Sequence, residues 1–405
     1  IKEKMIDLKP DGSYRLNMEY FDYQNGGTMI CEERFAELFG GGRRQPESAI
    51  TSREMNIAAS VQKLVEEMII LIAEHAKEVY GQGINNLVLA GGVALNCVAN
   101  GKLLREKIFE RIWIQPAAGD AGGALGAALY AYYMEYHGKR RVDDCDSQQG
   151  SYLGPEFSVE EIKRYLQNNG YVYHEIADWA EFFEKAAHEL ASEKVIGLFH
   201  GRMEYGPRAL GNRSIIADSR SPKMQSKLNL KIKYRESFRP FAPSVLEERL
   251  GDYFELPAPS PYMLLVDEVK KENQRPFDLD RLLAASEEDM LPVVNEVRSD
   301  IPAVTHVDYS ARIQTVNRER NEHYYDLIKA FEKETGCGVI VNTSFNVRGE
   351  PIVCTPQEAY ECFMRTEMDV LLLENLIDER RKYHESCKRK HNTVDRSRGR
   401  RIGAT

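Results

Sequence analysis

A basic stretch of the sequence, from Arg202 to Arg239, has the composition of an anion-binding site. Ten Lys or Arg residues stand against three acidic residues, and ten minus three gives a local excess of +7 in a chain whose formal net charge is −9 at pH 7. Self-repulsion makes such an excess unfavourable unless an anion offsets it. Two glycines and two prolines interrupt the stretch: Gly206, Gly211, Pro207 and Pro240. Because these residue types impose tight backbone geometry, we expect a pocket for phosphate or another compact anion, with a solvated basic surface as the alternative.

Several side chains of this stretch are candidates for contact with the anion. Arginine offers planar, bidentate donors to phosphate, and lysine adds a compact point charge. The cationic candidates for substrate binding or catalysis are Arg202, Arg208, Arg213, Lys233, Arg235 and Arg239. Glu204 is the acidic candidate, because its carboxylate could orient an arginine or accept a proton. We take Arg208, Lys233, Arg239 and Glu204 as the candidate catalytic residues.

A glycine pair follows a short apolar segment in LVLAGGVALN. Gly91 and Gly92 stand between a predicted strand and a predicted helix, where free backbone N–H groups can meet an anion. A simple turn explains the two glycines equally well. The candidate nucleotide contacts of this segment are Gly91, Gly92 and Asn96.

Asp120 stands between a predicted strand and a helix rich in glycine and alanine. Its carboxylate could cap the helix, bind a metal ion or contact a nucleotide at the end of the strand. The glycines around it are Gly119, Gly122, Gly123 and Gly126. Such small residues allow close packing under a nucleotide and favour a functional role over a cap, with Asp120 as a candidate metal ligand.

Short polar side chains gather at the end of another predicted strand, in VNTSFNVRGEP. The candidates there are Asn342 for the substrate, and Thr343, Ser344 and Asn346 for the nucleotide. An Asx or Ser/Thr turn is the alternative interpretation. Arg312 lies among small residues in HVDYSARIQTV. That setting suits an arginine that reaches into a pocket, and it suits a surface arginine equally well.

Length and composition predict a globular protein of two domains. The 405 residues exceed one average domain, and 42% hydrophobic with 29% charged residues is ordinary for a globular chain. No apolar run approaches the ~20 residues that a membrane span requires, so no membrane association is expected. Seven scattered cysteines without a C-x-x-C pair indicate reduced thiols in a cytoplasm. The chain begins with Ile1 and without an apolar leader, so we expect a fragment or a processed product.

The spacing of apolar residues predicts an α/β protein, and the α-β-α-β-α order of the first half predicts a parallel sheet covered by helices there. In the first half, helices are expected over 53–80, 95–105 and 121–136, and strands over 86–90 and 111–115. In the second half, Ser158 and Glu161 predict a capped helix. Strands are expected there over 171–174, 195–199, 262–266 and 338–342.

Composition also predicts the domain boundaries. We expect a first domain over 1–139, a polar linker over 140–157, a second domain over 158–377 and a basic tail over 378–405. The tail holds ten Lys or Arg and four acids with almost no apolar periodicity. This composition favours a mobile tail or an expression remnant over an arm that binds nucleic acid.

Six motifs, taken in order, resemble the ATP-dependent O-carbamoyltransferases, the group that includes nodulation-factor and antibiotic carbamoyltransferases. They are LAGGVALNCVANGKL, GDAGGALGAAL, GRMEYGPRALGNRS, KIKYRESFRPFAPS, SARIQTV and VNTSFNVRGEP, and they extend from residue 89 to residue 351. Six ordered motifs make the resemblance far more specific than a single glycine-rich loop. It implies the latter half of an actin-like ATPase-type domain, followed by a twisted α/β domain of the threonylcarbamoyl-AMP synthase type.

The resemblance also implies an activity. Enzymes of this family use carbamoyl phosphate and ATP to form a carbamoyl-adenylate in the second domain. The carbamoyl group then moves to a hydroxyl of a small-molecule acceptor in the first domain, near an iron-type metal, while Mg²⁺ would accompany ATP. The residues implied to hold carbamoyl phosphate are Arg208, Lys233, Arg239, Arg312 and Asn342. Ser344 and Asn346 would then lie at the nucleotide, and Asp120 would be one metal ligand.

The sequence departs from the family in one respect. The family's first domain begins further upstream and contains two ligand histidines four residues apart, whereas none of the nine histidines here forms a His-x-x-x-His pair. We therefore expect a truncated chain that resembles only the C-terminal region of the family, with incomplete metal and acceptor sites. The helix over 53–80 would then expose apolar surface, which predicts self-association, for example as a homodimer.

Two other functions stay open at this stage. One is a component of tRNA threonylcarbamoylation that binds RNA and nucleotide, because both domains resemble parts of that pathway. The weaker one is a non-catalytic regulator that binds nucleotide. Binding of tRNA requires a broad basic face. Here the positive charge is concentrated at motif positions in an acidic chain, so nucleic acid is not the expected partner.

Overall fold

The computed structural model describes residues 1–379 except 25, 46, 47, 49, 82, 143–145 and 279–290, and at 291 and 292 it describes the backbone alone. The chain divides into two compact units. The first comprises Ile1–Ala90 and Asn96–Gln115, and the second comprises Gly91–Leu95 and Pro116–Thr405. The predicted tail lies outside the described residues, apart from its first two positions.

The first unit combines a β-hairpin, three helices and a parallel strand pair. Strand β1 (Ile6–Leu8) pairs antiparallel with β2 (Tyr14–Leu16), and β3 (Asn86–Leu89) pairs parallel with β4 (Arg111–Ile114). The helices are α1 (Glu32–Phe39), α2 (Ser52–Tyr80) and α3 (Cys97–Arg105), with the short helix η1 (Met18–Tyr20). The predicted long helix, the following helix and both predicted strands are thereby confirmed, each to within two residues.

Local sequence explains where these helices begin. The Thr51 backbone N–H donates to Oε2 of Glu54 over 3.0 Å in a capping box that starts α2. Asn96 accepts from the Ala99 backbone N–H over 3.1 Å and starts α3. The buried core of this unit consists of Ala73, Leu103 and Phe109.

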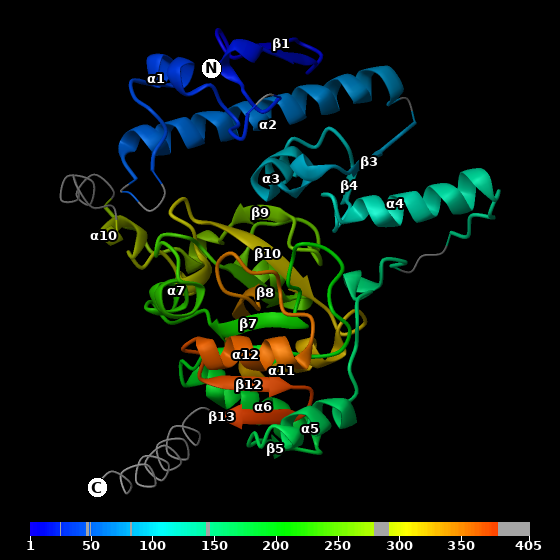
Figure 1. The fold of residues 1–405 in the computed structure, drawn as a ribbon, viewed down its shortest axis with the longest axis vertical. Coiled ribbons are helices and arrows are strands. Elements are labelled where there is room, and N and C mark those ends of the chain that lie inside the picture. The colour runs from blue at the N-terminus through cyan, green and yellow to red at the C-terminus, as the bar shows by residue number, and fades with distance from the viewer. Residues whose placement is uncertain are drawn as a thin grey trace, which may run out of the picture. The chain divides into compact units, whose positions relative to one another are not determined.

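The second unit is built on a mixed sheet of nine strands in the order β5-β13-β12-β6-β7-β11-β8-β10-β9 (Figure 1). The strands are β5 (His174–Glu175), β6 (Ile196–Phe199), β7 (Arg213–Asp218), β8 (Ala242–Leu246), β9 (Leu265–Glu268), β10 (Ser310–Val316), β11 (Val339–Ser344), β12 (Val370–Leu373) and β13 (Leu376–Glu379). The pairs β12–β6 and β10–β8 are parallel, and the other pairs are antiparallel. The fold is therefore mixed α/β with one large sheet.

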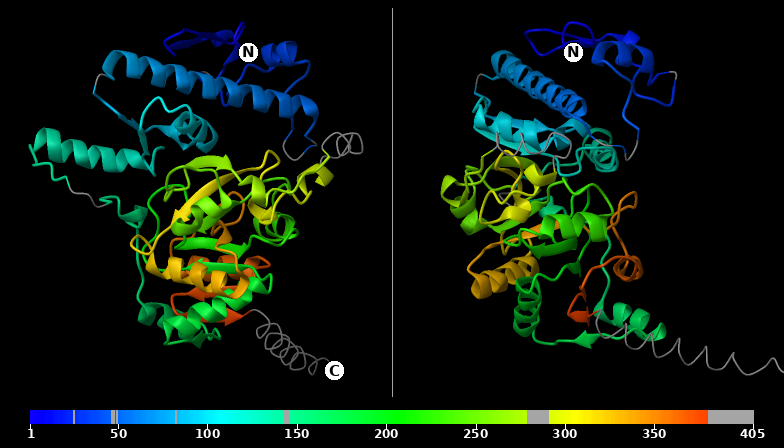
Figure 2. Two further views of the ribbon diagram at one scale, coloured as in Figure 1. Left: turned by 180° about the vertical axis from the view of Figure 1, so that it is seen from behind. Right: turned by 90° about the vertical axis from the view of Figure 1, so that its left-hand side faces the viewer.

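Helices cover both faces of this sheet. Helices α6 (Trp179–Ala191) and α11 (Glu322–Thr335) pack together on one face, and α12 (Pro356–Arg365) lies on the other (Figure 2, right). The remaining helices of the unit are α4 (Gly122–Tyr130), α5 (Val159–Asn168), α7 (Met224–Leu228), α8 (Leu250–Tyr253) and α10 (Leu291–Val294). Short helices are η2 (Gly92–Leu95), η3 (Ala131–Glu135), η4 (Gln149–Ser151), η5 (Asn229–Lys233), η6 (Glu247–Arg249), η7 (Lys271–Asn273) and η8 (Pro302–Val304). Covering both faces buries strands such as β6 and β12 completely.

Several predictions for this unit can be compared directly with the structure. The capping box of Ser158 and Glu161 at the start of α5 is confirmed. The predicted helix over 121–136 is confirmed as α4 followed by the π-helical turn η3. The strands predicted over 195–199 and 338–342 correspond to β6 and β11. The strands predicted over 171–174 and 262–266 overlap only partly with β5 and β9.

The segment predicted as a linker is tied to the second unit at its end. Asp146 accepts from the Tyr262 hydroxyl over 2.6 Å and from Nε of Arg320 over 3.2 Å. The backbone N–H of Met203 donates to the Pro155 carbonyl over 2.9 Å. Residues 146–157 therefore form part of the second unit's structure. Across the described part of the chain, no helix is both long and apolar enough to cross a membrane.

A candidate anion-binding site

Glu204 organises the loop that joins β6 to β7. Its Oε1 accepts from the backbone N–H groups of Leu210, Asn212 and Arg213 over 2.7, 2.8 and 3.2 Å. The side chain is 5% exposed, and within the described residues Oε2 has no hydrogen-bond partner. A carboxylate that gathers three N–H groups fixes the path of a loop in the way that an anion fixes a nest of amides. The structure thus gives Glu204 a role in holding the loop.

Two glycines of this loop occupy backbone conformations that other residues rarely adopt. The φ angles of Gly206 and Gly211 are +130° and +117°. A Cβ at Gly211 would lie 2.3 Å from Cδ1 of Tyr324, so the loop passes against α11 where no side chain fits. The tight geometry predicted from the glycines is confirmed at both positions.

Arg213 points into the protein. Its Nη1 donates to the carbonyls of His200, Gly201 and Asn212 over 2.9, 3.2 and 3.0 Å. The guanidinium lies 3.6 Å from the ring centroid of Phe199, and burial lowers the pKa of Arg213 to about 10. The structure uses this guanidinium to join the two ends of the loop, so Arg213 is not among the groups that we place at the anion.

The other two arginines of the loop diverge. Arg208 is half-buried, and its Nη2 donates to the Leu95 carbonyl over 3.4 Å. Arg202 is exposed, donates to the Leu153 carbonyl over 3.3 Å and lies 3.9 Å from Glu156. Arg202 and Arg208 are therefore not counted with the cationic residues described next.

Lys233 lies at the end of the π-helical turn η5 and is 3% exposed. Its Nζ donates to the Asn346 carbonyl and Oδ1 over 2.9 and 2.8 Å, to the Ser344 hydroxyl over 3.3 Å and to the Ser344 carbonyl. Burial, together with the charge of Arg235, lowers the pKa of Lys233 to about 7. The contacts bring together a lysine and two polar residues that the sequence analysis proposed from separate motifs.

Three arginines form a cationic cluster next to this lysine. Burial, and then the charges of Arg239 and Arg312, lower the pKa of Arg235 to about 10. Nε of Arg235 donates to Oδ1 of Asn229 over 2.7 Å, which fixes the guanidinium. Glu236 is the acidic neighbour, with its Oε2 3.1 Å from Nε of Arg239. We refer to Arg235, Arg239 and Arg312 as the arginine cluster.

The end of β11 supplies the polar side of the site. The Ser344 hydroxyl donates to Oδ1 of Asn346 over 2.7 Å, and Nδ2 of Asn346 donates to the Glu350 carbonyl over 2.7 Å. Thr343 is half-buried beside them on the same strand. The short polar residues therefore form a hydrogen-bonded turn, and this turn also receives Lys233.

Asn342 belongs to a buried polar network that the sequence analysis did not foresee. Nδ2 of Asn342 donates to Oε1 of Gln314 over 2.7 Å and to the Ala209 carbonyl over 3.1 Å. The Ser244 hydroxyl donates to the same Gln314 oxygen over 2.6 Å and accepts from the Tyr324 hydroxyl over 2.8 Å. The network joins β8, β10, β11 and α11 to the Glu204 loop. The signal in the sequence was weak: single polar residues inside otherwise apolar strands.

Among the described residues, Gly91, Gly92 and Asp120 form no hydrogen bond or ion pair with Lys233 or the arginine cluster. Gly91 has a φ of +92°, as a tight turn after β3 requires. Asn96 caps α3, and its Nδ2 donates to Oε1 of Gln62 over 2.9 Å. Asp120 is exposed just ahead of α4, whose N-cap is Ala121. Among the residues that the structure describes, no group of three or more His, Cys, Asp or Glu could hold a metal ion.

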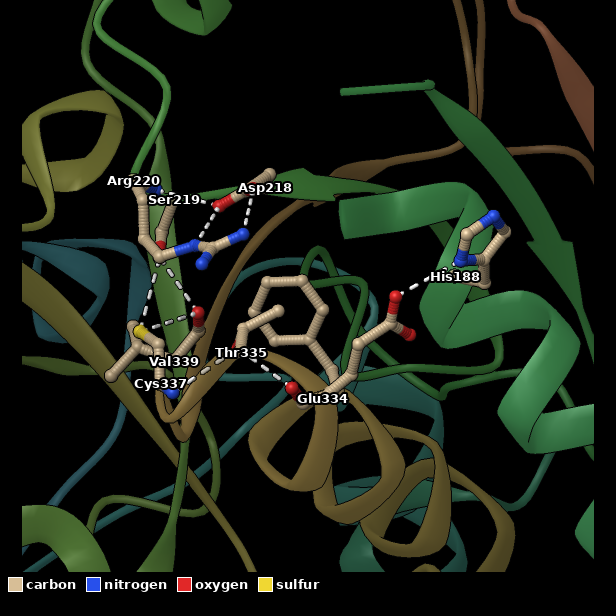
Figure 3. Close-up of polar contacts among 9 residues, drawn as sticks. His188, Asp218, Ser219, Arg220, Glu334, Thr335, Cys337 and Val339 are labelled. Carbon is tan, nitrogen blue, oxygen red and sulfur yellow. Dashed lines mark hydrogen bonds and ion pairs between the residues drawn. The ribbon is translucent and has the colours of Figure 1, made fainter. Parts of the chain in front are cut away.

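Another basic residue of the stretch, Arg220, is neutralised at the end of β7 (Figure 3). Its Nε and Nη2 donate to the two oxygens of Asp218 over 3.0 and 2.7 Å. The neighbouring Ser219 hydroxyl donates to the Val339 carbonyl over 2.6 Å, and Cys337 lies beside it. At this end of the strand, the side chains of Arg220 and Ser219 are therefore engaged in contacts within the protein.

The fold and the site together define an α/β protein with a cationic cluster in its second unit. The family model described as carbamoyltransferase N-terminus matches residues 1–129, and the one described as carbamoyltransferase C-terminus matches residues 187–380. The chain belongs to the carbamoyltransferase family. The expectation that it resembles only the C-terminal region of the family is wrong, because the matches include both parts.

Curated relatives support this assignment. The chain is 56% identical over 381 residues to the uncharacterized protein sll1178 of Synechocystis sp., covering 93% of this chain and 60% of that protein. It is 37% identical over 379 residues to nodulation protein NolO of Bradyrhizobium diazoefficiens, covering 91% and 64%. It is 36% identical over 379 residues to nodulation protein NolNO of Sinorhizobium fredii, covering 94% and 50%. The chain thus spans half to two thirds of the length of these relatives.

A solved structure, full-length HypF in its phosphate- and nucleotide-bound form, gives a TM-score of 0.31 at 14% identity. The similar region covers 65% of this chain and 36% of the HypF chain. This likeness is too low to support an argument about fold or function.

Proposed function

We propose that the second unit binds carbamoyl phosphate and ATP and forms a carbamoyl-adenylate, from which the carbamoyl group passes to a hydroxyl of a small-molecule acceptor. Membership of the carbamoyltransferase family supports carbamoyl as the transferred group. The observation that carries the proposal is the convergence of Lys233 with Ser344 and Asn346 beside the arginine cluster. A cationic centre of this kind suits substrates that carry several negative charges.

The side chains have complementary roles in this proposal. The arginine cluster offers planar donors to phosphate oxygens, and Lys233 adds a positive charge held by neutral oxygens only. Because no carboxylate of the described residues is hydrogen-bonded to Lys233, its charge is available to an anionic ligand. Donors fixed in advance by Asn229 and Asn346 stabilise developing negative charge without reorganising during the reaction.

The proposed reaction balances in three steps. Water cleaves carbamoyl phosphate to carbamate and phosphate. A carbamate oxygen then attacks the α-phosphorus of ATP, and pyrophosphate leaves with the electron pair of the broken P–O bond. Finally the acceptor hydroxyl attacks the carbamoyl carbon, loses its proton, and AMP leaves. Lys233 and the arginine cluster would bind the phosphate groups and stabilise the leaving anions.

The domain assignment is part of the proposal. We propose that 1–139 belongs to an actin-like ATPase-type domain and that 158–377 forms a domain of the threonylcarbamoyl-AMP synthase type. The motifs GDAGGALGAAL and VNTSFNVRGEP support this assignment. Mg²⁺ would accompany ATP as its counterion. The exposed Asp120, without a metal-binding group in the described residues, does not fit an iron-type centre, and no step is assigned to one.

Two further properties complete the proposal. A cytoplasmic location is supported by the scattered cysteines of the sequence, which include no C-x-x-C pair. Self-association is supported by large apolar side chains that are exposed in the first unit. They include Val61, Ile72, Val79, Tyr80, Val88 and Trp113.

The test measures whether carbamoyl phosphate triggers release of phosphate and pyrophosphate from a mixture with Mg²⁺-ATP. Wild-type protein should release both in equal amounts, and omission of either substrate should stop pyrophosphate release. Arg312→Met should slow release by tenfold or more, because one charge-assisted bond contributes roughly 1.5–3 kcal/mol. Arg318→Met is the matched control, since Arg318 is an exposed arginine paired with Glu322 and Asp326. Pyrophosphate release that does not depend on carbamoyl phosphate would refute the proposal.

A further inference from the structure

The loop that leads into β10 fixes the proton arrangement of His306. Ser310 donates its backbone N–H and its hydroxyl to Oδ1 of Asp308 over 3.0 and 2.7 Å. An ionised carboxylate can only accept, so the single hydroxyl proton of Ser310 is used in that bond. Nδ1 of His306 lies 3.0 Å from the Ser310 hydroxyl oxygen. Nδ1 must therefore carry the proton and donate it to Ser310.

The same contacts leave Nε2 of His306 with a lone pair. Burial lowers the pKa of His306 to about 4, and the charge of Arg312 lowers it as well, while Asp308 acts in the opposite direction. The imidazole is therefore neutral at pH 7, with its donor used internally and its acceptor at Nε2. Within the described residues, Nε2 has no hydrogen-bond partner. The backbone holds the ring in place, since the His306 N–H donates to the Ser310 carbonyl over 2.8 Å.

The geometry of β10 places this histidine next to the anion site. Side chains two residues apart on a strand share a face, so Ser310, Arg312 and Gln314 lie on one face of β10. Gln314 contacts Asn342 on that face, and Arg312 belongs to the arginine cluster. His306, bonded to Ser310, extends the row. The side chains of the arginine cluster can only donate hydrogen bonds. His306 supplies a hydrogen-bond acceptor beside them.

We propose that Nε2 of His306 accepts a hydrogen bond from the amide NH₂ of the carbamoyl substrate and so selects carbamoyl phosphate over acyl phosphates without an N–H group. The proposal rests on the proposed function, because it assumes that the cluster binds the phosphate of this substrate. Carbamoyl phosphate carries an anion at one end and an amide donor at the other. The site offers donors for the first and, at His306, an acceptor for the second. A site that hydrogen-bonds a substrate N–H discriminates strongly against an analogue that lacks it.

The test compares the binding of carbamoyl phosphate and acetyl phosphate, which has a methyl group in place of the NH₂. Both are titrated into wild-type protein, His306→Asn and His306→Gln by calorimetry. Asparagine can still donate to Ser310 from the position of Nδ1, but it has no acceptor at the position of Nε2. Glutamine places an amide oxygen near the position of Nε2. Melting temperatures confirm that each variant is folded.

Wild-type protein should prefer carbamoyl phosphate by about tenfold or more, because acetyl phosphate leaves the acceptor at Nε2 unpaired and an unpaired polar group commonly costs that factor. His306→Asn should reduce this ratio to near one with unchanged affinity for acetyl phosphate, and His306→Gln should restore part of it. If His306→Asn keeps the wild-type ratio, the inference is wrong although the proposed function stands. If wild-type protein binds neither compound, the proposed function itself fails.

Discussion

Nζ of Lys233 lies 2.8 Å from Oδ1 of Asn346, although 113 residues separate the two in the chain. The contact joins the end of a π-helical turn to the end of β11. In the part of the chain that the structure describes, no carboxylate is hydrogen-bonded to this amine. A buried ammonium held by neutral oxygens is a poor source of stability. Its retention is understandable if the charge acts on a ligand.

Lys233→Met should change how stability depends on pH. The pKa of Lys233 is about 7 in the folded chain, below its ordinary value of 10.5, so above pH 7 the unfolded chain binds a proton that the folded chain releases. Wild-type stability should therefore gain about 2 kcal/mol from this group between pH 7 and 8.5. The variant should lack that gain. Urea denaturation at both pH values measures it, and Lys231→Met, at an exposed lysine paired with Glu367, should behave as wild type.

Anion binding should be coupled to protonation of Lys233. A dianion favours the charged amine and raises its pKa, so binding at pH 7.5 should take up part of a proton. Sulfate is a suitable probe because it does not titrate in this range. Calorimetry in buffers with different ionisation enthalpies measures the uptake. Equal uptake by wild type and Lys233→Met would show that another group is responsible.

Glu204→Ala should destabilise the protein. The substitution leaves the backbone N–H groups of Leu210, Asn212 and Arg213 without their shared acceptor. Buried donors that lose a partner cost about 1–3 kcal/mol, and some of them would find water, so we expect a total of about 2–4 kcal/mol. Glu204→Gln keeps one oxygen and should lose less. The midpoint of urea unfolding measures both, and a wild-type midpoint for the alanine variant would contradict the role assigned to Glu204.

Gly211→Ala should be destabilising for two separate reasons. The backbone at Gly211 has a φ of +117°, and the added methyl would lie 2.3 Å from the ring of Tyr324. Strain at such a position typically costs 1–3 kcal/mol, so we expect a loss of roughly 2 kcal/mol or more. Gly251→Ala is the control, because it lies in a helix with no atom within 4 Å of the new methyl. Thermal unfolding should separate the two variants, and equal melting temperatures would disprove the argument.

Sequence reasoning predicted the elements whose apolar spacing is regular. Helix α2 was recognisable because its apolar face repeats at helical spacing and Gly81 follows it. Strand β7 was missed because it begins with Arg213 and ends with Asp218, which hides a completely buried strand among charged residues. Both charges are buried with partners: Arg213 donates to the His200 carbonyl across the loop, and Asp218 accepts from Arg220 two residues on. The spacing of apolar residues does not contain that information.

In the candidate site too, the sequence predicted some features and left others undetermined. Residue type and spacing selected Lys233, Ser344 and Asn346, and the structure brings these three together. Residue type could not separate Arg213, whose guanidinium serves backbone carbonyls, from Arg235 in the cluster. The direction of a side chain depends on which strands become neighbours.

The buried network around Gln314 determines when the site can form during folding. Its hydrogen bonds join residues that are 70, 104 and 133 positions apart in the chain. Contacts over such separations form slowly, because the intervening chain must lose its freedom before any bond forms. The anion site should therefore mature only after the central strands have assembled. A carbamoyl-phosphate analogue would then not accelerate the early folding steps. It would slow unfolding instead, because it binds only to the assembled sheet.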